Sequence, residues 1–271
     1  MIYFGETASG GAVEGAPLAS VAPGLFVREL ACVDSELRPL RGEQARIRGC
    51  RRYRRLDTDG LATHFYSGND GMASALLFDP RADVWGPANP ERPVQLVREL
   101  GDRGRLPQNL PVYNTEAGFQ FDPIRRPLLG AAAQAFELNL AEYLQWRTPG
   151  IGSFAQYLIN DDLFWFSGLR SIDGRAKQAY AAFRMPIMVR AGPPGHVRIW
   201  GASLGRRQGR PVEIWRNGLP ALISVRPDNP RGYFDVVVPE GTPGSRFQLS
   251  DGLLGARSRA MAALPAGTVP D

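Results

Sequence analysis

Four short apolar runs, each ending in polar residues and followed by a longer amphipathic or irregular stretch, set the strongest limit on how this chain can fold. This alternation is typical of parallel strands joined by crossover connections. With 271 residues, 44% of them hydrophobic, the chain can bury a sizeable core. The sequence therefore predicts an α/β region with a parallel sheet over residues 1–187. The four predicted strands are Met1–Gly5, Gly60–Ser67, Leu110–Gly118 and Ser153–Asn160.

The clearest predicted helix lies between the third and fourth runs. Its apolar residues recur at spacings of three and four, which places them on one helical face. They are Leu129, Ala133, Phe136, Leu140, Tyr143 and Leu144. A helix over residues 94–100 is predicted to cover the sheet, and a short helix over residues 175–184 is predicted to end before Pro186.

Beyond about residue 187 the pattern changes to short strands of period two, separated by Gly and Pro turn residues. Five such strands predict a small antiparallel β-sandwich over residues 188–255. The strands are expected at residues 197–200, 212–215, 221–225, 233–238 and 246–249. Residues 256–271, rich in Ala and Pro, are expected to form a tail.

The charge pattern disfavours nucleic acid and membrane partners. Thirty-two basic residues face 27 acidic ones, and the densest basic run, Arg51, Arg52, Arg54 and Arg55, is not part of a stripe interleaved with aromatic residues. No apolar stretch approaches the roughly 18 to 20 residues that a membrane-spanning helix needs. Met1 is not followed by a signal peptide, so we expect neither an export signal nor an anchor in this sequence. Nothing in the sequence indicates an oligomeric state.

Cys32 and Cys50 are the only cysteines, and the loop-like sequence between them favours a disulfide over two buried thiols. A disulfide would place the protein outside the cytosol, since such bonds persist in oxidising compartments. The export signal would then lie upstream of Met1.

Glu116 is the leading candidate for chemistry, because active sites of parallel barrels form at the carboxyl ends of the strands. It ends the third apolar run and is followed by Ala117 and Gly118, so the chain can turn away and leave the carboxylate in the mouth of the barrel. The alternative is a structural Glu paired with one of the many arginines.

His64 and Tyr66 end the second run and, two residues apart, share one face of a strand. We expect His64 to hold a sugar hydroxyl or to orient Glu116, although a histidine in a strand is more often a core residue. Gln156 and Tyr157 lie in the predicted fourth strand and Trp165 lies just beyond it, and they offer the amide and aromatic groups that sugars bind. The aromatic residues could instead serve packing alone.

Other chemistries lack their motifs. Two cysteines and two distant histidines do not have zinc-ligand spacing, and the sequence has no Gly-x-Ser-x-Gly elbow or phosphate-binding loop. The sequence therefore predicts no metal and no organic cofactor, and leaves carboxylate chemistry.

Over residues 1–187 the chain resembles retaining (β/α)8 glycoside hydrolases, in particular the cellulase-like enzymes of actinobacteria. The resemblance depends on Gly5-Glu6-Thr7, on Gly60–Ser67, which is similar to a Gly-Phe-x-x-His-Pro-Tyr segment, on Thr115-Glu116-x-Gly118, and on Gln156-Tyr157 before Gly168-Leu169. It implies that Glu116 is the nucleophile at the end of barrel strand seven, acting on a β-linked poly- or oligosaccharide. Phe65 stands where the family pattern has Pro, which affects the local loop.

The same resemblance implies that the chain holds strands five to eight, the second half of the barrel, followed by the small β-sandwich. A retaining mechanism needs a second carboxyl group about 5 Å from the nucleophile. The Asn-Glu-Pro motif that carries it in this family is absent, so we expect it upstream of Met1. Glu6 is a weaker candidate for the acid/base, or a binding residue. The half-barrel would leave two open edges and would pair with further polypeptide.

Two alternatives remain open. The chain could be a non-catalytic carbohydrate-binding or structural remnant of such an enzyme, in which the same residues only hold sugar. The half-barrel could also be inert while the β-domain serves attachment, although that domain has no clear sugar-binding stripe, since Trp200 and Trp215 could both be core residues.

Overall fold

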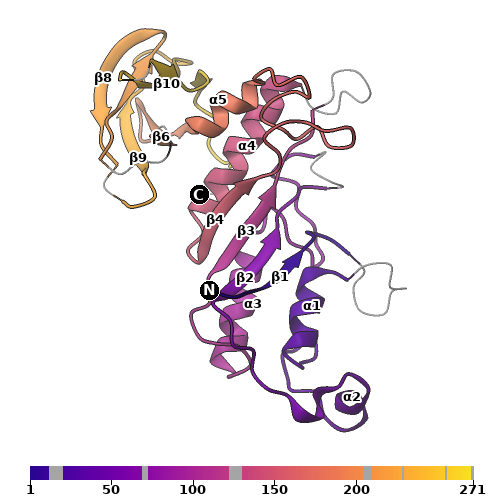
Figure 1. Cartoon of the computed structure of the whole chain (residues 1–271). Coiled ribbons are helices and arrows are strands. Elements are labelled where there is room, and N and C mark those ends of the chain that lie inside the picture. The colour runs from indigo at the N-terminus through magenta and orange to yellow at the C-terminus, as the bar shows by residue number, and fades with distance from the viewer. Residues whose placement is uncertain are drawn as a thin grey trace. The chain divides into compact units, whose positions relative to one another are not determined.

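The computed structural model describes residues 1–11, 21–68, 73–121, 130–203, 205, 209–227, 229–253 and 255–269, with the side chains of residues 221 and 222 left aside. The chain divides into two compact units. The first comprises Met1–Gln120 and Leu144–Leu158, and the second comprises Phe121–Tyr143 and Ile159–Asp271. Figure 1 shows the strands and helices of each unit.

The first unit contains the predicted parallel sheet. Its four strands are β1 (Tyr3–Thr7), β2 (Gly60–His64), β3 (Val112–Ala117) and β4 (Ile151–Gln156). They lie in the order β1-β2-β3-β4 and every neighbouring pair is parallel. Successive βα units produce a sheet order that follows the sequence, as in a barrel. Here the sheet is open, with β1 and β4 at its edges among the described residues.

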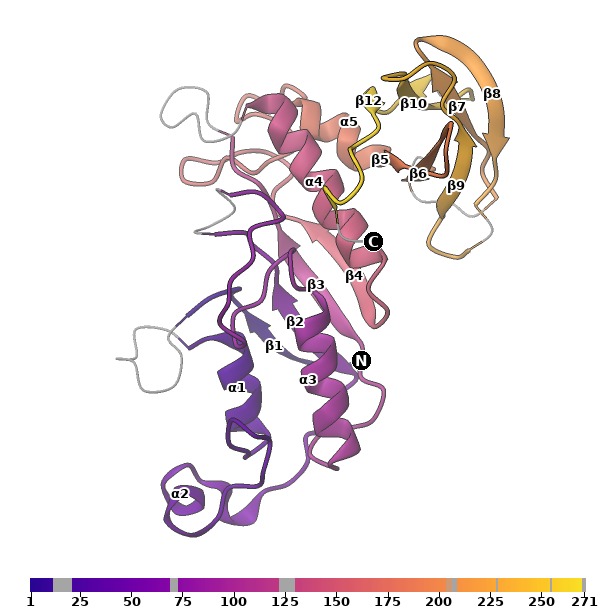
Figure 2. The same cartoon turned by 180° about the vertical axis from the view of Figure 1, so that it is seen from behind.

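Helices cover one face of this sheet. The first unit contains α1 (Pro23–Leu30), the short α2 (Gly42–Ile47) and α3 (Glu91–Asp102), and Figure 2 shows α1 and α3 on the same side of the strands. The buried core joins both helices to three strands. Its helical and strand members include Val27, Val97, Leu100, Leu61, Val112 and Ile151. The prediction of a helix over 94–100 is confirmed by α3, whereas the eight-residue α1 and six-residue α2 were not predicted, because elements this short show little periodicity.

Helix α4 (Ala131–Trp146) begins in the second unit and ends in the first. It confirms the predicted helix between the third and fourth strands, and its Ala- and Leu-rich sequence has high helix propensity. Leu129 of the predicted apolar face lies outside the described residues. Of the other five, Leu140, Tyr143 and Leu144 are buried. The helix predicted over 175–184 is α5 (Gln178–Arg184) in the second unit.

The second unit is mainly antiparallel. One sheet has the order β5-β6-β9, and the other contains β11-β10-β7-β8, with β12 also pairing with β10. Their strands are β5 (Ile187–Ala191), β6 (His196–Ala202), β7 (Val212–Arg216), β8 (Leu219–Val225), β9 (Tyr233–Pro239), β10 (Arg246–Asp251), β11 (Ala256–Arg257) and β12 (Met261–Ala262). The five predicted strands correspond to β6–β10.

Residues that the sequence predicted as a tail include β11 and β12, and Met261 and Val269 are buried. Trp200 is fully buried and stacks on Tyr233 at 5.4 Å between ring centroids, which shows that Trp200 is a core residue. Trp215 is partly covered by the guanidinium group of Arg257, 3.8 Å from its ring centroid.

Cys32 and Cys50 form a disulfide with a Cα–Cα distance of 5.6 Å, as the sequence favoured. The bond joins the end of α1 to the 3-10 helix η1 (Cys50–Arg52) and packs with the buried Ala45 and the partly buried Leu40 and Tyr53. It therefore fixes the excursion that carries α2.

Removing the disulfide is expected to destabilise the first unit. The cysteines are 18 residues apart, and closing a loop of this size restricts the unfolded chain by about 3 kcal/mol. A Cys32→Ser/Cys50→Ser variant should show that loss in amide hydrogen exchange of β2, which reports the opening of the first unit. A reductant should accelerate exchange in the natural chain and leave the variant unchanged. An equal effect of the reductant on both would contradict this prediction.

Candidate functional site

A bulge at the carboxyl end of β1 presents Glu6. Gly5 pairs with Ala62 and Thr7 with Thr63, so Glu6 is one extra residue in the edge strand, and its φ is 55°. Gly5 has a φ of 107°, and a Cβ there would lie 2.3 Å from the carbonyl oxygen of Ala62. Only glycine therefore permits this close approach of β1 to β2. Bulges commonly re-aim a side chain next to a functional site.

A second bulge, in β3, places Glu116 beside His64. Thr63 pairs with Asn114 and His64 with Glu116, which leaves Thr115 as the extra residue. The fully buried Asn114 stabilises the bulge. Its Oδ1 accepts the backbone N–H of Glu116 at 3.2 Å, and its Nδ2 donates to Gln145 Oε1 at 2.8 Å. Sequence reasoning missed Asn114, although an amide two residues before a strand-end carboxylate is a local signal.

Four predicted site residues are in contact, and we call them the carboxylate cluster: Glu6, His64, Tyr66 and Glu116. His64 Nε2 lies 2.9 Å from Glu6 Oε1, and His64 Nδ1 lies 3.0 Å from Glu116 Oε2. The Tyr66 hydroxyl donates to Glu116 Oε1 at 2.7 Å. The side chains of His64 and Glu116 are 18% and 22% exposed, whereas that of Glu6 is 60% exposed. Glu116 is thus held firmly yet open to solvent on one side.

The contacts define what the carboxylate cluster can do. Tyr66 and His64 each bind one oxygen of Glu116, so its carboxylate is fixed in orientation, as a nucleophile requires. A neutral imidazole carries one N–H, so in that form His64 can donate to only one of the two carboxylates. Donation to both requires the imidazolium form, which carries two N–H groups. The ring of His64 also stands between Glu6 and Glu116, which keeps the two carboxylates out of direct contact.

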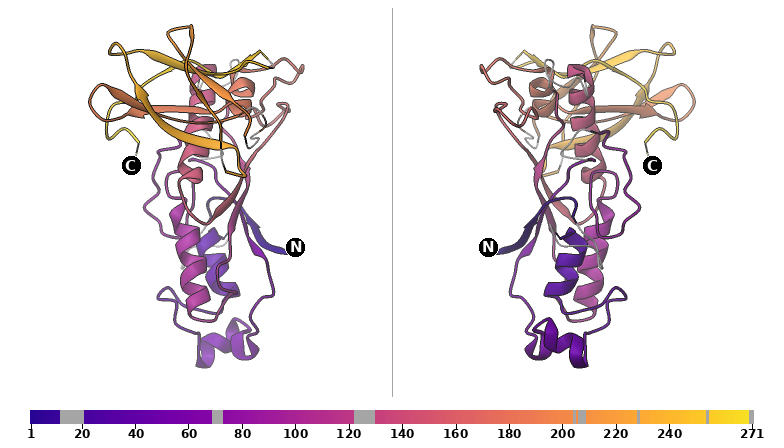
Figure 3. Two further views of the ribbon diagram at one scale, coloured as in Figure 1. Left: turned by 90° about the vertical axis from the view of Figure 1, so that its left-hand side faces the viewer. Right: turned by 90° about the vertical axis from the view of Figure 1, so that its right-hand side faces the viewer.

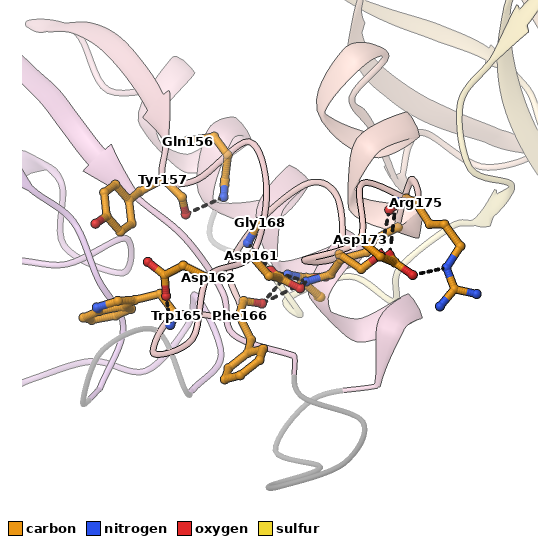
Figure 4. A network of polar contacts seen from close by, with 12 residues as sticks. Gln156, Tyr157, Asp161, Asp162, Trp165, Phe166, Gly168, Asp173 and Arg175 are labelled. Carbon is orange, nitrogen blue, oxygen red and sulfur yellow. Dashed lines mark hydrogen bonds and ion pairs between the residues drawn. The ribbon is translucent and has the colours of Figure 1, made fainter.

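The other predicted binding residues lie apart from these contacts. Gln156 pairs with Ala117 at the end of β4, and the Tyr157 amide donates to the Ala117 carbonyl oxygen at 2.8 Å, so both adjoin the end of β3. Figure 4 shows the Gln156 amide turned toward the carbonyl oxygen of Tyr157, to which it donates at 2.7 Å. The half-buried Trp165 belongs to the second unit, where its backbone N–H donates to Asp162.

A cleft of about 540 Å³ opens at the same carboxyl edge of the first unit. Tyr66 is one of its walls and also binds Glu116, so the cleft adjoins the carboxylate cluster. Its other walls come from the segments after β1 and β2. They include Ser9, Gly10, Leu77, Phe78, Asp79, Arg81, Trp85 and Asn89. Phe78 is 57% exposed and Trp85 is 1% exposed. The sequence prediction missed these residues because they lie outside any periodic element.

An ion pair from α1 and hydrogen bonds from α3 fix the segment 78–86 that forms one wall of the cleft. Arg28 of α1 makes two hydrogen bonds to Asp83, and both side chains are nearly buried. Arg92 of α3 donates to the carbonyl oxygens of Asp79, Arg81 and Val84. Its guanidinium also lies 4.6 Å from the centre of the Phe78 ring. The wall is therefore preorganised by two helices.

Asp79 and Arg81 form a second ion pair at this wall, with an Nη2–Oδ2 distance of 2.6 Å. The pKa of Asp79 is lowered below its usual value, mainly because the Arg81 side chain donates a hydrogen bond to its carboxylate. The cleft thus offers a charged carboxylate, a guanidinium and an exposed aromatic face together. Sugar rings bind groups of this kind, with hydroxyls on the polar groups and the apolar face on an aromatic ring.

Within the part of the chain that the structure describes, no three His, Cys, Asp or Glu side chains are arranged as a metal site. Among these described residues, no helix is both long and apolar enough to cross a bilayer.

No protein-family model and no curated protein matches the chain. Solved structures with partial similarity include the FMN-binding beta-glucuronidase from Facaelibacterium prausnitzii L2-6, at 12% identity and a TM-score of 0.33, covering 79% of this chain and 33% of that one. The GH39 enzyme from Xanthomonas axonopodis pv. citri shows 14% identity and a TM-score of 0.28, covering 68% of this chain and 53% of that one. The endo-beta-1,4-mannanase from Thermotoga petrophila shows 11% identity and a TM-score of 0.24, covering 77% of this chain and 48% of that one. The chain spans about a third to a half of the length of these proteins.

Proposed function

We propose that this chain is the nucleophile-bearing part of a retaining glycoside hydrolase that acts on a β-linked poly- or oligosaccharide. The observation that supports this most directly is Glu116, held by Tyr66 and His64 at the carboxyl edge of a parallel sheet, beside an aromatic-walled cleft. In this proposal, residues 1–187 form the second half of a (β/α)8 barrel and residues 188–255 form a β-sandwich. The enzyme is proposed to be of the cellulase-like type.

In the proposed reaction, a Glu116 oxygen attacks the anomeric carbon while the bond from that carbon to the leaving oxygen breaks. A general acid gives its proton to the leaving oxygen, and water later releases the sugar from Glu116. Tyr66 and His64 fix the direction of attack. Gln156, Tyr157 and Trp165 are proposed to bind sugar, and Phe78 offers the free face of its ring to a neighbouring sugar unit.

Glu6 is a poor general acid in this arrangement. It binds the far side of the His64 ring and is largely exposed, so it does not face a leaving group across a shared cleft. We propose that the acid/base belongs to polypeptide outside these residues, and that Glu6 orients His64. The disulfide supports the further proposal that the protein works in a secreted form.

The second candidate function is sugar binding without catalysis. Among the contacts of Glu116 that the structure describes, none is with a second carboxyl group. This favours sugar binding without catalysis. Sugar binding alone would use the same cleft and would not require Glu116 to react.

The test is hydrolysis of a panel of soluble β-glucans and aryl β-glycosides, by this chain and by a chain extended with the residues encoded upstream of Met1. We expect the extended chain to hydrolyse at least one substrate and this chain to be much slower, because it lacks the acid. Binding of the same glucans, followed by affinity electrophoresis, should be present in both. Binding without hydrolysis in either chain would support the second candidate instead.

A further inference from the structure

The segment between α1 and β2 carries a cluster of arginines, most of which have no acidic partner among the described residues. Residues 38–55 contain eight arginines and one acidic residue, Glu43. Three of the eight have acidic partners: Arg38 with Asp34 and Glu36, Arg46 with Glu43, and Arg48 with Glu29. The other five have no ion-pair partner among the described residues, and all are exposed. We call them the arginine surface: Arg41, Arg51, Arg52, Arg54 and Arg55.

The backbone beneath the arginine surface is fixed at several points. The disulfide ties Cys50, directly before Arg51, to the end of α1. Tyr53, between the two arginine pairs, donates its hydroxyl to the carbonyl oxygen of Arg105. The Arg105 guanidinium lies 3.5 Å from the centre of the Tyr53 ring and donates to the Ala31 carbonyl oxygen at 2.7 Å. Four arginines within five residues are thus held on a rigid segment.

A hollow of about 300 Å³ adjoins this surface. Arg41 of the arginine surface lines it together with Gln44 and Arg48, and its other walls include Glu29 and Asp34, which pair with Arg48 and Arg38. Figures 1 and 3 place α2 and its flanking residues at the end of the first unit remote from the carboxyl ends of its strands. The arginine surface is therefore separate from the carboxylate cluster.

Charge and geometry indicate the kind of partner. Arg51 and Arg55 are at most about 14 Å apart along an extended chain, so their segment has a high density of positive charge. Such self-repulsion is relieved by a polyanion, and the guanidinium fork matches carboxylate groups in a bidentate manner. Nucleic acid binding to single strands uses free aromatic faces, whereas Tyr53 already packs against Arg105.

We infer that the arginine surface binds a carboxylate-bearing polysaccharide of the polyuronate type. This surface anchors the first unit to an anionic polymer and leaves the carboxylate cluster at the opposite end free. The choice of a polysaccharide over other polyanions rests on the proposed function, whereas the need for an anionic partner does not.

The test measures binding of the whole chain to polygalacturonic acid, with dextran as the neutral polymer. Replacing Arg51, Arg52, Arg54 and Arg55 by glutamine should weaken binding at least about tenfold, since each exposed cation near an anionic surface contributes to affinity. Binding by the natural chain should also fall as salt is raised. A matched variant carries Arg175→Gln, Arg184→Gln, Arg226→Gln and Arg231→Gln, which are exposed and lie in the second unit. Both variants lower the formal charge from +5 to +1 by removing four arginines.

Loss of binding in the first variant alone supports the inference, and an equal loss in both variants would overturn it, since net charge would then suffice. Tighter binding to duplex DNA, or to phosphatidylserine vesicles, than to the polyuronate would also overturn it and identify a different partner. Glu116→Gln should bind polygalacturonic acid normally. Arginine-dependent binding, with no hydrolysis either by this chain or by the chain extended upstream of Met1, would therefore refute the proposed function and leave this inference standing.

Discussion

The natural chain, mixed with a 2,4-dinitrophenyl β-glycoside, is expected to release a burst of about one dinitrophenolate per molecule, and Glu116→Gln is expected to abolish it. The expected loss of the initial rate is on the order of a thousandfold or more, because the amide cannot form the glycosyl ester. The burst is measured by stopped-flow absorbance, and the sugar on Glu116 by the mass of its peptide.

This substrate tests the proposed nucleophile separately from any general acid. Dinitrophenolate departs without a proton, so in the proposed mechanism glycosylation would require attack by Glu116 and its orientation by Tyr66 and His64, but no general acid. The following step needs a base to activate water. A chain without the acid/base should therefore stop after one turnover and accumulate the covalent intermediate.

Two variants serve as controls. Glu6→Gln should retain the burst, because Glu6 contacts His64 and does not touch Glu116. Glu91→Gln removes an exposed carboxylate at the start of α3 and should change nothing. If Glu116→Gln kept the burst, or if Glu6→Gln removed it, the assignment of the nucleophile would be wrong.

The strands of the first unit could be predicted because each is a compact apolar run with a polar end. The ends were less certain, since predicted Ser153–Asn160 is observed as Ile151–Gln156. The sequence also indicated that His64 could orient Glu116, since the carboxyl ends of parallel strands share one edge, but the hydrogen bond from Tyr66 to Glu116 was not predicted. In the second unit, period-two alternation sufficed for five strands. The five-residue β5 was not predicted, and the two-residue β11 and β12 are too short to show a period.

The bulges could not be predicted, because register depends on how strands distant in sequence pair. Glu6 reaches His64 only because it is an extra residue at positive φ, and nothing in Gly5-Glu6-Thr7 by itself specifies a bulge. The wall of the cleft could not be predicted for the same reason. Arg28 and Asp83 are 55 residues apart, and their pairing emerges only when α1 and the segment after β2 pack together.

Breaking that pair is expected to destabilise the first unit strongly. Arg28→Met would leave the Asp83 carboxylate, whose side chain is 13% exposed, without its bidentate partner. Removing one member of a buried ion pair costs about 3 to 5 kcal/mol, because the remaining charge stays desolvated. Amide exchange in β2 should then accelerate by on the order of a hundredfold or more.

The exposed pair of Arg38 with Asp34 provides the matched control, since the same Arg→Met change there removes a contact of a side chain that is 65% exposed. Exposed pairs contribute at most about 1 kcal/mol, so Arg38→Met should alter β2 exchange less than about fivefold. Arg28→Met/Asp83→Leu should recover much of the loss, because no unpaired charge remains. Equal effects of Arg28→Met and Arg38→Met would show that the buried pair does not support this wall, and the cleft would then need another source of rigidity.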